Sequence, residues 1–218
     1  MAASAEEARR PALATSPEPA RVTGQVLSIQ TGRVRPLQVG DRKAMSAIGK
    51  TPRLGKVEVG VLGLQGDEQA DLTVHGGLSK AIYALPSAHL PWWQEKRQQQ
   101  RQHRGASLFD DVLTPGWLGE NLSLQGVSET DLFIGDCLKF ESVVLRVTQP
   151  REPCGKFNAV MGYAQAGKDM VQSGRCGFYL AVDAPGVLQA GEHFEVLPGP
   201  RSVSVAQALQ HKAWKHLR

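Results

Sequence analysis

The chain contains few cysteines and no long apolar run. Only three of its 218 residues are cysteine, and no two of them form a CxxC pair. An odd number of widely spaced thiols argues against a disulfide framework and a structural zinc site, and it favours free thiols in a reducing cytoplasm. No stretch approaches 18 apolar residues and the first twenty residues hold no apolar segment, so we expect neither a membrane span nor a secretory signal.

The charge of the chain is mild. The formal net charge is +4 and the sequence pI is about 9.1. Such a charge is compatible with an anionic ligand but is too weak to indicate nucleic acid, and the basic stretch at 95–104 is most simply a solvated helix face. We therefore expect neither a nucleic-acid partner nor a membrane partner.

The length and composition favour one large domain. Residues 1–20 are rich in Ala, Pro, Ser and Glu and are typical of a disordered tail. We expect residues 21–218 to form a single domain.

Short apolar stretches separated by glycine turns fill most of that domain, which is typical of a mostly β protein, either a compact barrel or a sandwich. We expect strands at 22–29, 57–64, 122–124, 137–140, 143–148, 177–182 and 192–197. A few peripheral helices should accompany them. We expect these at 87–104 with Ser87 as N-cap, at 169–172, and at about 203–217, where apolar residues recur with helical spacing.

A glycine-rich polar loop that ends at Lys80 is the first candidate site. Gly76 and Gly77 would let backbone amides approach a ligand closely, and Lys80 adds positive charge, a combination that suits phosphate. His75 and the acidic residues before it could instead hold a metal ion. The remaining interpretation is a plain polar loop in which the carboxylates accept backbone N–H groups.

Asn121 is the second candidate. It lies at the expected start of a strand, and its side chain has both a donor and an acceptor, which suits the edge of a heterocycle. The alternative is that Asn121 merely caps its own turn.

Cys154 is the third candidate, in a short polar turn that follows an apolar strand. Pro153 fixes the backbone before it and Gly155 removes bulk after it. Arg151 and Lys156 favour the thiolate, which is the form that binds metals or attacks electrophiles. The residues alone leave open whether this thiol is functional or inert.

The other two cysteines have different surroundings. Cys137 lies in an apolar alternation, and we interpret it as an inert core residue. Cys176 lies in the stretch Gly174-Arg175-Cys176-Gly177, and its role stays open.

Taken together, these stretches resemble the MOSC family, named for the C-terminal part of molybdenum cofactor sulfurases, and within it the YiiM-type bacterial proteins. Each motif is weak alone, but their order and spacing are specific, and the resemblance covers about residues 22–210. The residues that carry it are Gly66-Asp67-Glu68-Gln69-Ala70-Asp71, His75-Gly76-Gly77, Lys80-Ala81, Pro86, His89, Gly119-Glu120-Asn121-Leu122, Gly135-Asp136, Gln149-Pro150-Arg151 and Pro153-Cys154.

The resemblance implies a β-barrel-like MOSC fold that holds molybdenum cofactor, a pterin dithiolene with a terminal phosphate. It implies that Cys154 is the protein ligand to molybdenum and the catalytic residue. A soft thiolate is a natural ligand for a thiophilic metal that already carries dithiolene sulfur. The residues expected to contact the pterin or its phosphate are His75, Gly76, Gly77, Lys80, Asn121, Arg151, Lys156 and Arg175.

The activity that the resemblance implies is reduction of N-hydroxylated compounds, such as hydroxylaminopurine bases and amidoximes. No GxGxxG fingerprint and no cysteine cluster for an iron–sulfur centre is present, so a reductase or flavodoxin-like protein should supply the electrons. The alternative is a non-catalytic carrier of the cofactor, or of persulfide sulfur on Cys154. The adjacent Trp92 and Trp93 suggest either a homodimer interface or core packing.

Overall fold

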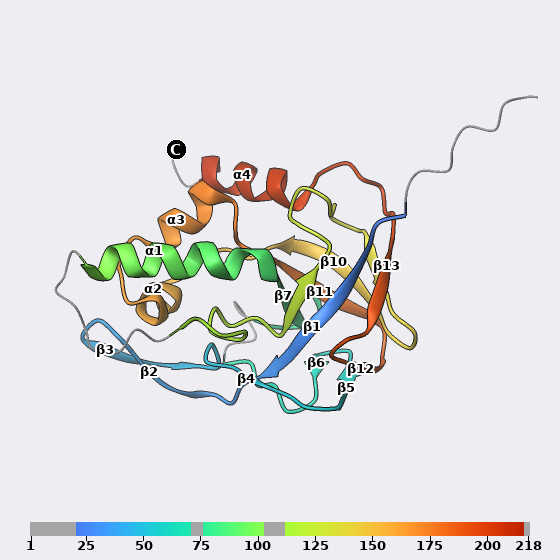
Figure 1. Ribbon diagram of the computed structural model, residues 1–218, viewed down its shortest axis with the longest axis horizontal. Helices are drawn as coiled ribbons and strands as arrows, with labels where there is room; N and C mark the ends of the chain where they lie inside the picture. The colour runs from blue at the N-terminus through green and yellow to red at the C-terminus, as the bar shows by residue number, and fades with distance from the viewer. Residues whose placement is uncertain (1–20, 71–75, 103–111, 216–218) are drawn as a thin grey trace, which may run out of the picture.

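A seven-stranded antiparallel-rich barrel forms the centre of the protein in the computed structural model, which describes residues 21–70, 76–102 and 112–215 (Figure 1). Most of its strands alternate inward apolar and outward side chains, as a strand with one buried face requires, whereas β7 is buried at every position. Around the barrel the order is β13 (His193–Leu197), β9 (Cys137–Lys139), β10 (Val144–Pro150), β11 (Phe178–Ala184), β7 (Ile82–Pro86), β8 (Leu122–Gln125) and β1 (Thr23–Thr31), which pairs back with β13.

One pair of neighbouring strands, β7 and β8, is parallel, whereas the other barrel pairs are antiparallel. A parallel pair needs a long crossover connection. The crossover here contains the 3-10 turn Ser87–His89 and helix α1 (Leu90–Gln102). Both β7 and β8 therefore run in the same direction across the barrel wall.

Two small sheets and a short strand extend from the barrel. Strands β5 (Lys56–Gly60) and β6 (Gly63–Leu64) form a sheet with β12 (Gly186–Gln189). Strands β2 (Arg35–Val39) and β3 (Arg42–Ser46) form a separate hairpin, and β4 (Thr51–Pro52) pairs with one end of β1. Figure 1 shows the β2–β3 hairpin projecting from the barrel below α1 and α2.

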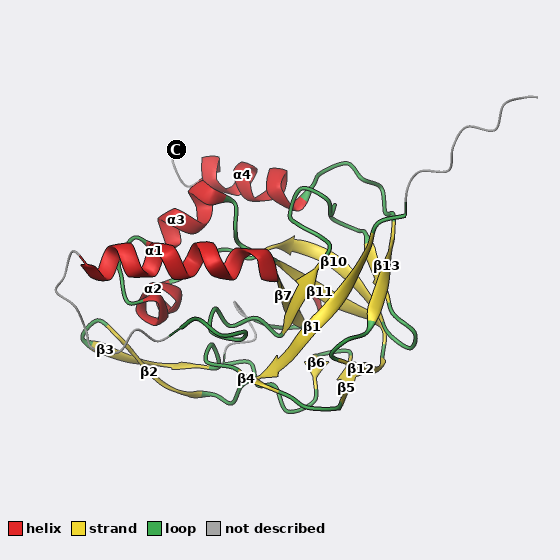
Figure 2. Cartoon of the chain, in the orientation of Figure 1, coloured by secondary structure: helices red, strands yellow, loops and turns green. Residues whose placement is uncertain are grey.

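Helices cover one side of the barrel (Figure 2). They are α1, α2 (Gly155–Met161), α3 (Ala166–Ser173) and α4 (Val205–Lys215), and a 3-10 turn at Leu78–Lys80 precedes β7. A second apolar cluster joins them to the barrel through side chains such as Trp93, Phe157, Met170 and Leu209. The ring of Trp93 is fully buried and lies 5.2 Å from that of Phe157, so core packing explains this half of the tryptophan pair.

The prediction of a mostly β barrel with a C-terminal helix is confirmed. Two details of the expected elements are wrong. The stretch 57–64 is a hairpin of β5 and β6 and not one strand, because the chain turns at Val61 and Leu62. Helix α1 begins at Leu90, so Ser87 is not its N-cap. Ser87 is instead the first residue of the preceding 3-10 turn, and its carbonyl accepts the N–H of Leu90.

The cysteine environments also differ from expectation. Cys137 is not a core residue: it is partly exposed on β9, and Leu138 beside it carries the buried position. Cys176 is fully buried, and burial raises the pKa of its thiol. Within the described ranges no helix is long and apolar enough to cross a membrane. The division into tail and single domain stays a prediction, because residues 1–20 lie outside the described part of the chain.

Candidate functional site

An open cavity, with about 620 Å³ of empty space when its mouth to solvent is included, lies against the outer face of the barrel wall formed by β7 and β11. Tyr83 and Tyr179 face it, and they alternate along their strands with Ile82, Ala84 and Leu180, which point into the barrel. The remaining walls come from connections between strands. They are Ser46, Ala47, Ile48, Lys50, Asp67, Glu68, Gln69, Ala70, Lys80, Ala81, Leu118, Gly119, Asn121, Arg151, Cys154 and Lys156.

The strand register explains why these distant segments meet. Pro150 at the end of β10 pairs with Phe178 at the start of β11, Phe178 pairs with Ala84, and Ala84 pairs with Leu122 at the start of β8. The segments after β10 and before β8 therefore leave the barrel at the same level.

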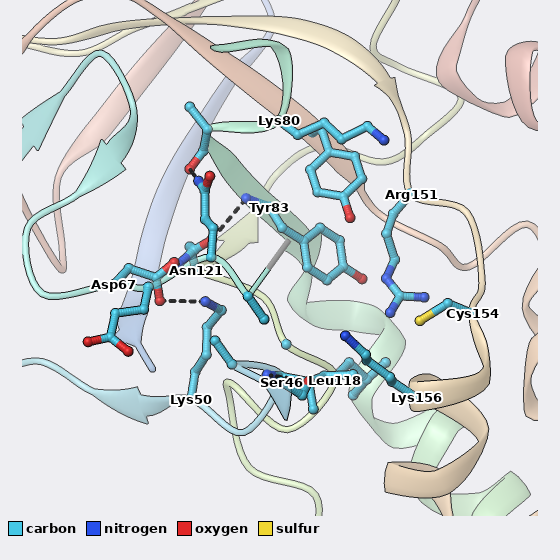
Figure 3. A pocket seen from close by; sticks show the side chains of 18 residues that line it. Ser46, Lys50, Asp67, Lys80, Tyr83, Leu118, Asn121, Arg151, Cys154 and Lys156 are labelled. Carbon is cyan, nitrogen blue, oxygen red and sulfur yellow. Dashed lines mark hydrogen bonds and ion pairs between the residues drawn. The ribbon is translucent and has the colours of Figure 1, made fainter. Parts of the chain in front are cut away.

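Cys154 is the N-cap of α2, with extended backbone angles (φ −141°, ψ 166°), and its carbonyl accepts the N–H of Phe157 at 2.9 Å. The polar turn expected around Cys154 is thus the start of a helix. The thiol is half-buried and is not in a disulfide. Figure 3 shows its sulfur facing the cavity beside the guanidinium group of Arg151.

Arg151 is a buried cation on the cavity wall, with only 5% of its surface exposed. Its guanidinium lies 4.7 Å from the ring centre of Phe157 and 5.5 Å from that of Tyr83, and Nη1 donates to the Glu152 carbonyl at 3.3 Å. Among the described residues, no carboxylate forms an ion pair with it. A buried cation without an anionic partner makes this part of the cavity attractive to an anion.

Asp67 and Lys50 form a buried ion pair on the opposite wall, where each side chain is 7% exposed (Figure 3). Asp67 also accepts the N–H of Gly32 at 2.7 Å and the side-chain amide of Asn121 at 2.8 Å. Burial lowers the pKa of Lys50, and the adjacent Asp67 partly opposes that shift. The expectation that Asp67 accepts a backbone N–H is confirmed.

Asn121 lines the cavity but is strongly engaged by the protein. Its oxygen accepts the N–H of Tyr83 at 3.0 Å, and its amide nitrogen donates to the Gln30 carbonyl at 3.2 Å as well as to Asp67. The side chain therefore ties β1, β7 and β8 together. A ligand contact by Asn121 stays a prediction. The side-chain oxygen could make it, because an amide oxygen can accept two hydrogen bonds.

A tyrosine wall faces the thiol. The rings of Tyr83 and Tyr179 lie 5.6 Å apart, and the ammonium of Lys80 lies 5.7 Å from the Tyr179 ring centre. The Tyr83 hydroxyl donates to the Cys176 carbonyl at 2.8 Å. Tyr179 is half-exposed, so its ring offers an apolar face to a planar ligand.

Glu120 is fully buried next to Asn121 in the chain. Its Oε1 accepts the N–H of Gly116 at 2.6 Å, whereas its Oε2 has no hydrogen-bond partner in the described structure. Burial raises the pKa of this carboxyl to about 7. Near neutral pH, Glu120 is therefore poised between its charged and neutral forms.

The structure brings Cys154, Arg151, Lys156, Lys80 and Asn121 together around one cavity, as the sequence predicts. Gly76 and Gly77 do not line the cavity. The N–H of Gly77 donates to the side chain of Gln69, which is part of the cavity wall. His75 lies outside the described residues.

Arg175 does not lie with the others. It lines a second cavity, donates through Nη1 to Nδ1 of His89 at 3.2 Å and lies over the ring of Trp92. His89 Nε2 is 2.7 Å from Glu129, which also accepts the N–H of Gly177. These contacts hold the turn before β11 in place, so a role for Arg175 at the first cavity would need a rearrangement of this network.

Sequence reasoning missed Lys50, Tyr83 and Tyr179 as parts of the site. Lys50 lies in a stretch without a recognisable motif, and β7, which carries Tyr83, reads as a continuous apolar run. Only the pairing of Tyr83 with Tyr179 across β7 and β11 places the two rings on one wall. Knowledge of which strands pair would have been needed to find these two rings.

Comparison with known proteins agrees with this architecture. The MOSC domain model matches residues 71–195. Uncharacterized protein YflK of Bacillus subtilis and protein YiiM of Escherichia coli are each 32% identical to the chain, over 83% and 84% of its length and 76% of their own. A protein named reductase from Gibberella moniliformis is 30% identical over 86% of the chain, which spans 31% of that protein.

A solved structure gives the same result. The crystal structure of YiiM from Geobacillus stearothermophilus superposes with a TM-score of 0.66 at 29% identity, covering 88% of this chain and 85% of that one. Sequence and fold thus agree on one classification. This chain belongs to the MOSC domain family.

Proposed function

We propose that the chain binds molybdenum cofactor in the cavity beside Cys154 and reduces N-hydroxylated compounds with electrons from an external flavoprotein. The observation that carries the proposal is the juxtaposition of a half-buried thiol with the buried guanidinium of Arg151, which has no carboxylate partner among the described residues. The family and the relative named reductase support a redox role.

The residues of the cavity fit that cofactor. A thiolate suits molybdenum, and the cations Arg151, Lys156 and Lys80 suit a phosphate group. No group of three or more His, Cys, Asp or Glu side chains able to hold a metal ion occurs within the described ranges. A metal at Cys154 would therefore need further ligands from its own cofactor.

The proposed reaction converts R–NHOH, two electrons and two protons into R–NH₂ and water. The cofactor would supply two-electron redox chemistry, which no side chain offers alone. The protein would supply binding and protons. Tyr179 offers a ring face to a planar base, and Lys50, whose pKa burial lowers, gives up a proton more readily than an exposed lysine.

We also propose that the protein works in a reducing cytoplasm. None of its three cysteines forms a disulfide. A molybdenum ligand must stay a free thiolate, and a reducing compartment preserves it.

The test is to produce the protein in a host that makes the cofactor, measure molybdenum per chain, and assay hydroxylaminopurine reduction with reduced methyl viologen. Cys154→Ser should lose most of the bound molybdenum. Cys137→Ser is the matched control, because Cys137 is also partly exposed but lies outside the cavity. We expect it to keep the metal and the activity.

Equal molybdenum in wild type and Cys154→Ser would refute the ligand assignment. Molybdenum bound by the wild type without any turnover would refute the reductase and indicate a carrier of the cofactor.

A further inference from the structure

The β2–β3 hairpin is an exposed, basic arm. Its three cations, Arg35, Arg42 and Lys43, and Arg33 just before β2 are all exposed, and Asp41 is the one acidic residue between positions 33 and 46. None of the four forms an ion pair with a described residue. The hairpin therefore carries a concentrated positive charge in a chain whose overall net charge is only +4.

The two faces of the hairpin differ. Residues that pair across an antiparallel ladder share a face, so Leu37 and Ala44 lie on one face with Val39, and all three are half-buried. The opposite face presents Pro36 and Met45, which pair directly, and Met45 is 52% exposed. By the same register Lys43 shares the Met45 face, whereas Arg35 and Arg42 lie on the other face and are exposed. Arginine and methionine are enriched in protein interfaces, so an arm that exposes both residue types is typical of a docking site.

The base of the hairpin is part of the cavity. Ser46, the last residue of β3, and Ala47 and Ile48 after it line the cavity together with Cys154. β2 contacts the start of α2, where a Cβ added at Gly155 would lie 3.9 Å from Cγ1 of Val39. Whatever docks on the hairpin therefore lies beside the segment that carries the thiol (Figure 1).

That base is also rigidly seated. A Cβ at Gly32 would come within 2.8 Å of the Ala47 carbonyl, and a Cβ at Gly119 within 2.8 Å of Ile48, so the chain packs closely on both glycines. A rigid base with a solvated tip loses little conformational freedom when a partner binds. No aromatic residue occurs between positions 33 and 46, so the arm lacks the stacking surface of single-strand nucleic-acid sites.

We propose that the β2–β3 hairpin is the docking site for an acidic flavoprotein that delivers electrons to the cavity. This inference rests on the proposed reductase function, whose balance requires two electrons per R–NHOH from outside the chain. The reduced flavin is oxidised as the N–O bond breaks, and the two protons end in R–NH₂ and water. Opposite charge on the partner would speed its encounter with the arm.

The test compares two variants with the same change in charge. R42E/K43E reverses the tip of the hairpin, and K56E/K139E reverses two exposed lysines on β5 and β9, which belong to other sheets than the hairpin. Binding of the full-length protein to immobilised acidic flavodoxin and to a diflavin reductase is measured by biolayer interferometry at 50 and 300 mM NaCl. Hydroxylaminopurine turnover is measured with each flavoprotein and with reduced methyl viologen.

We expect R42E/K43E to weaken binding to at least one flavoprotein at 50 mM NaCl by about tenfold or more, mostly through a slower association rate. K56E/K139E should change it by less than about twofold, and 300 mM NaCl should remove most of the difference. Turnover with methyl viologen should be the same in all three proteins.

Three results would overturn the docking site: binding of neither flavoprotein to the wild type, equal loss in both variants, or no loss in R42E/K43E. Absence of turnover with methyl viologen in the wild type would overturn the proposed function instead. The binding measurement separates the two failures, because it does not depend on turnover.

Discussion

Replacing Glu120 by glutamine would remove a carboxyl group that lies wholly inside the protein, beside Asn121 on the cavity wall. The folded protein raises the pKa of this carboxyl from 4.5 to about 7, because burial disfavours the charged form. Its Oε2 has no hydrogen-bond partner in the described structure that could stabilise the charge. The folded state therefore holds a proton that the unfolded chain releases well below neutral pH.

The sign and size of the effect follow from proton linkage. Below pH 4.5 both states hold the proton and the stabilisation is fully present. As the pH rises to about 7 the unfolded state binds fewer protons than the folded state, so the free energy of unfolding falls. A shift of this size corresponds to about 3 kcal/mol at 1.36 kcal/mol for each pH unit.

Urea unfolding of the wild type and Glu120→Gln at pH 4.5, 5.5, 6.5, 7.5 and 8.5 measures this directly. Glutamine changes stability by an amount that does not depend on pH, so only the slope of the difference matters. We expect the wild type to lose about 3 kcal/mol relative to the variant across this range. Parallel curves for the two proteins would show that folding does not raise the pKa of Glu120 and that the reasoning from burial is wrong.

Two further predictions are tested by urea unfolding, each with a second variant for comparison. Gly177→Ala should destabilise the protein by more than about 2 kcal/mol, because φ is +66° there and the new Cβ would lie 2.3 Å from the Ala84 carbonyl. Gly155→Ala in α2 should instead be neutral or stabilising by about 0.5–1 kcal/mol. Similar urea unfolding midpoints for the two variants would contradict this prediction. Lys50→Met should lower stability by about 3–5 kcal/mol, since it leaves Asp67 charged and buried, and the double variant with Asp67→Asn should recover part of that loss. No recovery in the double variant would argue against the ion pair as the source of the loss.

The general architecture could be predicted from the sequence because it depends on short-range patterns. Alternating apolar residues predicted β1, β10, β11 and β13 to within a few positions, and the helical spacing predicted α4. The resemblance to the MOSC family is confirmed as well. Elements without such patterns were missed: β7 is buried at each position, and β2 and β3 contain mostly exposed residues.

Prediction of the site was more limited, for a physical reason. Cys154, Arg151 and Lys156 are close in sequence, so local chemistry was enough to group them. Arg175 was grouped with them by its charge, but its guanidinium is held by His89 on the far side of the turn. The sequence alone does not show toward which cavity a charged side chain next to a strand points.

Because the cavity lies outside the barrel, neighbouring positions on one strand differ in what a substitution would do in a directed-evolution experiment. Tyr83 and Tyr179 face the cavity, whereas Ile82, Ala84 and Leu180 fill the interior. A library at position 179, which is partly exposed, can therefore explore new ligands without opening holes in the barrel, whereas Tyr83 is buried in the second apolar cluster and is better left unchanged. The same diversity one residue away would empty the core and yield unfolded protein.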